Sequence, residues 1–160
     1  MPAPVAIAAD GWIPVVPFPK TVGTFLTGPP DTERTRIAYF RVPGAATLYA
    51  RAWFGPLTAG PPGHVHGGAI AAVLDEAMGG ACWMNGHATV AAQITIGFVD
   101  MLPLGTETIV ESWIESVDGR KLRLQATLKT ALGATIAEGQ GLFVALKDET
   151  LQSLNDLGGL

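Results

Sequence analysis

The pattern of apolar and polar positions predicts one long helix near the middle of the chain. Residues 67–83 carry large apolar side chains at helical spacing, and most of the positions between them are glycine or alanine. Asp75 and Glu76 are the only charged residues in this segment. A helix without a polar face has to be covered on all sides, so we expect this helix to lie in the core.

Further along the chain, period-two patterns predict strands. Four long runs follow the helix, and the short turns between them, several with glycine, make neighbouring strands antiparallel. These runs span residues 89–101, 107–117, 121–130 and 134–146. One or two further strands are expected within residues 35–54. The pattern is typical of an α+β fold in which an antiparallel sheet wraps around one long central helix.

The two ends of the chain break this pattern. Seven of the 12 prolines lie in the first 30 residues, so residues 1–34 are expected to form an extended arm. Trp12 and Phe18 are its candidate anchors. Residues 35–148 then form a single domain, and residues 149–160 are expected to be a frayed tail.

Composition and charge narrow the classes of function. The chain of 160 residues is 48% apolar but only 15% charged, which favours a globular protein that covers part of its surface by self-association. The net charge of −4, without a basic run, argues against a nucleic-acid surface. No apolar run approaches the ~20 residues of a membrane span, and the N-terminus lacks a basic start. With Cys82 as the lone cysteine, we expect a cytoplasmic protein.

Candidate chemistry gathers at the start of the predicted helix. His66, Gly67 and Gly68 lead into it, where unpaired N–H groups and the helix dipole attract negative charge and glycine permits close approach. Asp75 follows two turns later on the same side as Gly68. A buried carboxylate is costly unless it is paired or functional, so we interpret Asp75 as functional. For Glu76 we expect a structural ion pair at a subunit boundary.

Other chemistries find less support. His64, His66 and Asp75 do not supply the convergent ligand set that zinc requires, so no metal is expected. The chain has no Gly-x-Ser-x-Gly elbow, phosphate loop or dinucleotide fingerprint. Cys82 falls late in the buried helix and is interpreted as a small core residue.

The run from His66 to Asp75 resembles the HGG-x6-D helix signature of the hotdog acyl-coenzyme A thioesterases, of the phenylacetate-pathway and mammalian thioesterase-superfamily types. Similar residues recur at 93–98, 117–121 and 138–143, so the resemblance covers roughly residues 60–146. It implies the hotdog fold and hydrolysis of an acyl- or aryl-CoA thioester. It implies no cofactor beyond the coenzyme A of the substrate.

The same resemblance assigns roles to particular residues. Asp75 would be the general base or the nucleophile, the Gly67 N–H would polarise the thioester carbonyl, and His66 would help to position it. Arg120 and Lys121 would approach the nucleotide or pantetheine portion of coenzyme A. Such sites are built across a homodimer, and dimers can pair into tetramers.

The chain departs from the family pattern at Ala91. The family often has serine or threonine at this position, sixteen residues after the aspartate, and Thr89 or Gln93 is a candidate substitute here. Two alternatives to hydrolysis therefore stay open. One is a hotdog dimer that binds acyl-CoA, or a related ligand, without turnover. The other is a hotdog dehydratase or hydratase that uses His66 with Glu76.

Overall fold

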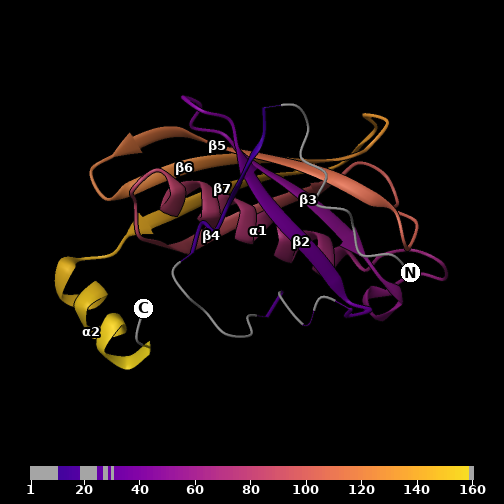
Figure 1. Ribbon diagram of the computed structural model, residues 1–160, viewed down its shortest axis with the longest axis horizontal. Coiled ribbons are helices and arrows are strands. Elements are labelled where there is room, and N and C mark those ends of the chain that lie inside the picture. The colour runs from indigo at the N-terminus through magenta and orange to yellow at the C-terminus, as the bar shows by residue number, and fades with distance from the viewer. Residues whose placement is uncertain (1–10, 19–24, 27–28, 30, 159–160) are drawn as a thin grey trace.

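The computed structural model of the protein describes residues 11–18, 25–26, 29 and 31–158 (Figure 1). Its strands, in chain order, are β1 (Ile13–Val15), β2 (Thr35–Arg41), β3 (Leu48–Phe54), β4 (Thr89–Phe98), β5 (Glu107–Asp118), β6 (Lys121–Thr130) and β7 (Thr135–Ala145). Its helices are the 3-10 helix η1 (Pro56–Thr58) and the α-helices α1 (Gly67–Met84) and α2 (Asp148–Gly158).

A single antiparallel sheet curls around α1 (Figure 1). The order of its seven strands is β1-β2-β3-β5-β6-β7-β4, which places the strand that directly follows α1 at one edge. All neighbouring strands are antiparallel. The hotdog architecture expected from the sequence is therefore confirmed, with α1 at its centre.

The core lies between α1 and the concave face of the sheet. Val73, Leu74 and Met78 on the helix are fully buried. Strand β7 approaches them closely because it carries glycine on its inner face. A Cβ added at Gly139 would lie 3.6 Å from the Leu74 Cβ, and one at Gly141 would lie 3.1 Å from the Met78 sulfur. The sheet and the helix thus leave no room for larger side chains here.

The N-terminal arm is held by the two aromatic residues that the sequence singled out. The Trp12 ring stacks on Tyr49 with 4.9 Å between ring centroids, and Phe18 meets Trp83 edge-on at 6.3 Å. Part of the arm is strand β1, so three strands precede α1 instead of the one or two expected. β1 is an edge strand, where the missing N–H of Pro14 is tolerated. Residues 1–10, 19–24, 27–28 and 30 of the predicted arm lie outside the described residues.

The expectation of a frayed C-terminal tail is wrong, because residues 148–158 form α2. Asp148 and Glu149 lie in its first turn, where negative charge favours the helix dipole. The Gln152 side chain donates a hydrogen bond to Asp156 one turn later. In Figure 1 this helix stands to one side of the sheet. Within the described ranges, no helix combines the length and apolarity that a bilayer crossing requires.

Strand β4 is an open edge of the sheet. It pairs with β7 on one side, and most of its side chains are exposed. Among them are Ile94, which is 37% exposed, and Phe98, which is 55% exposed. A long apolar edge of this kind is a surface on which another strand can pair.

If α1 is the centre of the core, truncating a side chain there costs far more stability than truncating one on the surface. Replacing the fully buried Leu74 with alanine is expected to lower the free energy of unfolding by about 2–5 kcal/mol, because it leaves a cavity. Replacing Leu132, which is 98% exposed, is expected to change it by less than about 0.5 kcal/mol. Denaturant titration measures both, and equal losses would contradict this assignment of the core.

Candidate active site at the start of the central helix

The first turn of α1 leaves one backbone donor free. His66 caps the helix, and its Nδ1 accepts a hydrogen bond from the Gly68 N–H at 2.8 Å. The Ala69 N–H donates to the His66 carbonyl at 2.9 Å. The Gly67 N–H donates to no acceptor among the described residues. Of the two glycine amides expected at the site, that of Gly67 is available to a ligand and that of Gly68 is engaged by the cap.

The capping bond also determines which nitrogen of His66 carries a proton. Because Nδ1 accepts a hydrogen bond, the neutral imidazole is protonated at Nε2. His66 is exposed, so its Nε2–H is a second donor at the start of α1, at the positive end of the helix dipole. Two such donors suit a carbonyl oxygen that gains negative charge during a reaction.

The segment before α1 holds His66 in place. The His66 N–H donates to the Thr58 carbonyl at the end of η1, at 2.8 Å. A Cβ added at Gly60 would lie 2.7 Å from the His66 Cα, so this close approach requires glycine. On the other side, a Cβ at Gly67 would lie 3.1 Å from the Phe98 ring. The role of Gly60 was missed from the sequence because it depends on a contact with a residue six positions later.

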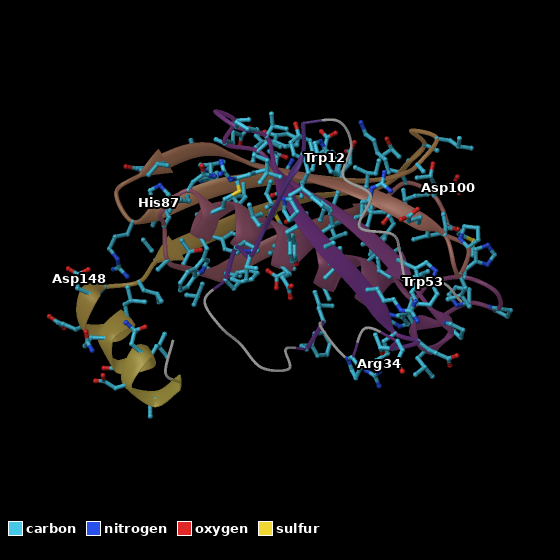
Figure 2. All side chains as sticks on the ribbon, viewed as in Figure 1. Trp12, Arg34, Trp53, His87, Asp100 and Asp148 are labelled. Atoms are coloured by element: carbon cyan, nitrogen blue, oxygen red, sulfur yellow. The ribbon has the colours of Figure 1, made fainter. Side chains whose placement is uncertain are left out.

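A cavity of about 380 Å³ opens beside this helix start. Gly68, Ala69 and Ala72 of α1 form one wall. The other walls come from the arm, from the start of β2, and from η1 with the residue after it. The arm contributes Phe25 and Leu26, the start of β2 contributes Arg34 and Thr35, and the η1 segment contributes Leu57, Thr58 and Ala59. His66 also lines the cavity. Figure 2 shows Arg34 and Trp53 at this end of the molecule and His87 at the opposite end. The sequence did not reveal this cavity, because segments far apart in the chain form it.

Asp75 lies about one helical turn beyond Ala72 on α1. It is half-buried, and burial raises the pKa of its carboxyl group. Among the described residues it has no hydrogen-bond donor and no cation as a partner. A half-buried carboxylate that nothing neutralises fits a proton acceptor or nucleophile better than a structural group.

The rise of α1 separates Asp75 from Gly67. Eight residues at about 1.5 Å each place Asp75 about 12 Å along the helix axis from Gly67. A single substrate carbonyl within hydrogen-bond distance of Gly67 is therefore out of reach of Asp75 of the same chain.

Glu76 faces β2 and binds within the chain. The Tyr39 hydroxyl donates to its carboxylate at 2.5 Å. Burial raises the pKa of Glu76, the hydrogen bond from Tyr39 lowers it, and the charge of Asp75 raises it. Burial and the Glu76 charge hold the pKa of Tyr39 well above its ordinary value. Within the chain, the partner of Glu76 is therefore a neutral hydroxyl on a neighbouring strand, and the expected ion pair at a subunit boundary stays a prediction.

The structure does not bring Thr89 and Gln93 to this site. Thr89 is buried near the far end of α1, where its hydroxyl lies against the Cys82 thiol. Gln93 lines a polar cavity of about 210 Å³ with Arg123 and Gln140 on the outer face of the sheet. The cause is a bulge between Ala91 and Gln93, which shifts the alternation of side chains along β4. Thr89 and Gln93 therefore do not share a face. In a regular strand their spacing of four positions would place both side chains on the same face.

Cys82 is a core residue, as expected. It is fully buried, and burial raises the pKa of its thiol despite the contact with Thr89. His64 turns away into its loop, where its Nδ1 donates to the Pro62 carbonyl at 2.8 Å. No group of three or more potential metal ligands occurs among the described residues.

Arg120 and Lys121 lie in the turn between β5 and β6 and are exposed. The Arg120 Nε donates to the Ala145 carbonyl at 3.0 Å, which places this turn at the end of the sheet where β4 begins. Gly67 lies at the other end of β4, against Phe98. Within one chain, the two basic residues and the helix start are therefore at opposite ends of the molecule.

Replacing Asp75 with asparagine is expected to raise the melting temperature at pH 7. Because burial raises the pKa of the Asp75 carboxyl, the folded protein binds this proton more tightly than the unfolded chain. Its contribution to stability is present below the unfolded pKa of about 3.9 and is lost as the pH rises through the folded value. Thermal unfolding at pH 7 and pH 4 measures the effect, which should shrink at pH 4. The exposed Asp118→Asn variant is the control, and a variant less stable than the parent at pH 7 would contradict the argument.

Comparison with known proteins shows which family the chain is similar to. The sequence model of the thioesterase superfamily matches residues 62–137, which include the helix start and Asp75. Acyl-coenzyme A thioesterase THEM4 of Bos taurus is 35% identical over 96 residues, which are 59% of this chain and 39% of that protein. The chain thus covers about two fifths of the length of this relative.

Solved structures carry the same fold. A thioesterase superfamily protein superposes with a TM-score of 0.64 at 30% identity, over 68% of this chain and 53% of that chain. The PaaI protein from the phenylacetic acid degradation operon of E. coli superposes with a TM-score of 0.63 at 17% identity, over 71% and 80% of the two chains. The resemblance inferred from the helix signature is confirmed, because residues 62–137 match the sequence model of the thioesterase superfamily.

Proposed function

We propose that the protein hydrolyses acyl- or aryl-coenzyme A thioesters to the free acid and coenzyme A. The observation that carries this proposal is the free Gly67 N–H at the start of α1, together with the capping His66, which lines the cavity beside it. The half-buried and unpaired Asp75 on the same helix supports it. So does the likeness to a protein named as an acyl-coenzyme A thioesterase.

In the proposed reaction the thioester oxygen accepts hydrogen bonds from Gly67 and His66. A donor of this kind typically contributes about 10²–10³ in rate by stabilising the developing oxyanion. The Asp75 carboxylate then either takes a proton from an attacking water or attacks the carbonyl carbon itself, to form an anhydride that water opens. In both routes the carbon–sulfur bond breaks and coenzyme A leaves as the thiol.

This chemistry needs Asp75 from a second copy of the chain, because Asp75 lies about 12 Å along α1 from Gly67. We propose a homodimer in which two β4 edges pair antiparallel. The central helices then run in opposite directions side by side, and Asp75 of one copy can lie level with Gly67 of the other. The exposed Ile94 and Phe98 on β4 support this pairing.

The same arrangement gives Arg120 and Lys121 a role in the site. An antiparallel pairing places the Thr89 end of one β4 beside the Phe98 end of the other. The turn that holds Arg120 and Lys121 then approaches Gly67 of the second copy. A guanidinium and an ammonium group there suit the phosphates of coenzyme A. This proposal accounts for two basic residues that are distant from the helix start in their own chain.

A second candidate function is acyl-CoA binding without turnover. Ala91 favours it, because a methyl group stands where the family often has a hydroxyl. The hydratase alternative has less support, because Glu76 is bound to Tyr39 and lies about 15 Å along the helix axis from His66.

Replacing Asp75 with asparagine is expected to lower kcat/KM by about 10²–10⁴, because the shape of the site is kept and the base is lost. Thiol release from a panel of acyl-CoA esters measures the rate. In the parent, activity should rise with pH through the raised pKa of Asp75, since only the ionised carboxylate reacts. The Asp118→Asn variant should match the parent. Unchanged hydrolysis by Asp75→Asn would refute the assignment, and binding without thiol release by the parent would favour the binding module.

A charge on the β4 edge is expected to separate the two copies. Ile94→Arg should sediment as a monomer and lose at least about tenfold in activity, because an unpaired charge is placed at the centre of the paired edges. Leu132→Arg adds the same charge at a turn and should keep the assembly and activity of the parent. An active monomer would contradict a site shared between copies.

A further inference from the structure

One wall of the cavity at the helix start comes from residues that precede the family segment 62–137. Phe25 and Leu26 belong to the N-terminal arm, and Leu57 belongs to η1. Leu26 is only 7% exposed and is part of the core cluster, so it fixes the arm at this place. Phe25, at 85% exposure, lies on the rim of the same cavity. The arm is therefore a structural part of the cavity.

The chemistry of the walls favours an uncharged apolar group. The helix side offers only the backbone and methyl groups of Gly68, Ala69 and Ala72. The arm and η1 face it with Phe25, Leu26 and Leu57. Arg34 is exposed, so its charge can stay in water at the edge. A chain of methylene groups or a phenyl ring loses no hydrogen bond on entering such a space.

We propose that this cavity holds the acyl group of the thioester and that the arm selects which acyl groups fit. The proposal rests on the proposed function, which places the carbonyl oxygen at Gly67. The cavity begins at the next residue, Gly68, so the carbon chain can enter it while the sulfur points out towards the open side of the helix. A volume of about 380 Å³ is near the lower end of ordinary ligand sites, which span roughly 300–1,000 Å³. This size suits short, medium or single-ring acyl groups.

The pantetheine portion of coenzyme A fits this cavity less well. It carries two amide groups, each of which needs hydrogen-bond partners when it leaves water. The Gly68 and Ala69 amides on the cavity wall are already bonded to His66. The acyl group is thus the better occupant of this space.

Filling the cavity tests the proposal. Leu57→Trp adds bulk to one wall and should lower kcat/KM for hexanoyl-CoA and phenylacetyl-CoA by at least about tenfold, while acetyl-CoA changes by less than about twofold. Phe25→Ala opens the rim and should shift the preference towards longer chains. Leu132→Trp places the same ring at an exposed turn and should leave the whole profile unchanged. Equal losses for acetyl-CoA and hexanoyl-CoA in Leu57→Trp would overturn the proposal.

A binding series separates this inference from the proposed function. In S-(2-oxoalkyl)-coenzyme A analogues a methylene lies between sulfur and carbonyl, so no hydrolysis occurs, and calorimetry measures their affinity directly. We expect the parent to bind the 2-oxoheptyl analogue at least about tenfold more tightly than the 2-oxopropyl analogue, and Leu57→Trp to remove this difference. If the parent releases no thiol from any thioester, the proposed function fails, whereas the binding series still decides where the acyl group lies. Equal affinity of the parent for both analogues would overturn the inference.

Discussion

A helix that has no polar face must be covered on every side, and α1 imposes this requirement on the whole chain. The sheet covers most of it, with glycines on β7 that let strand and helix approach closely. The arm covers more of it through Phe18 and Leu26. Asp75 remains only half-buried in the single chain. The carboxylate to which we assign the proposed chemistry is therefore one that the single chain leaves partly uncovered.

The same constraint is the basis of our proposal that the site divides between two copies. The helix start supplies donors at Gly67 and His66, but the length of α1 keeps its own Asp75 about 12 Å away along the axis. In the proposed dimer, a second helix in the opposite direction removes this separation, and the second copy's β4 covers the open edge of β4. In this account, burial of the helix and assembly of the site are one requirement, and self-association meets both.

Much of this could be predicted from the sequence, because it depends on local patterns. The period of the apolar residues predicted α1 and the four strands after it, and His66-Gly67-Gly68 with Asp75 marked the site. What was missed depends on register or on distant contacts. A single bulge in β4 sends Gln93 to the outer face. Tyr39 and Glu76 are far apart in the chain, so nothing local indicates their hydrogen bond. Helix α2 was missed because its short polar sequence resembles a loop.

The central claim is that each site takes its hydrogen-bond donors from one copy and its carboxylate from the other. Complementation tests it most directly, by mixing Asp75→Asn protein with His66→Ala protein after dissociation and reassociation. Random exchange makes half of the dimers mixed, and each mixed dimer holds one complete site of two, so about a quarter of the parent's thiol release should return. A mixture no more active than the two variants measured separately would contradict the account.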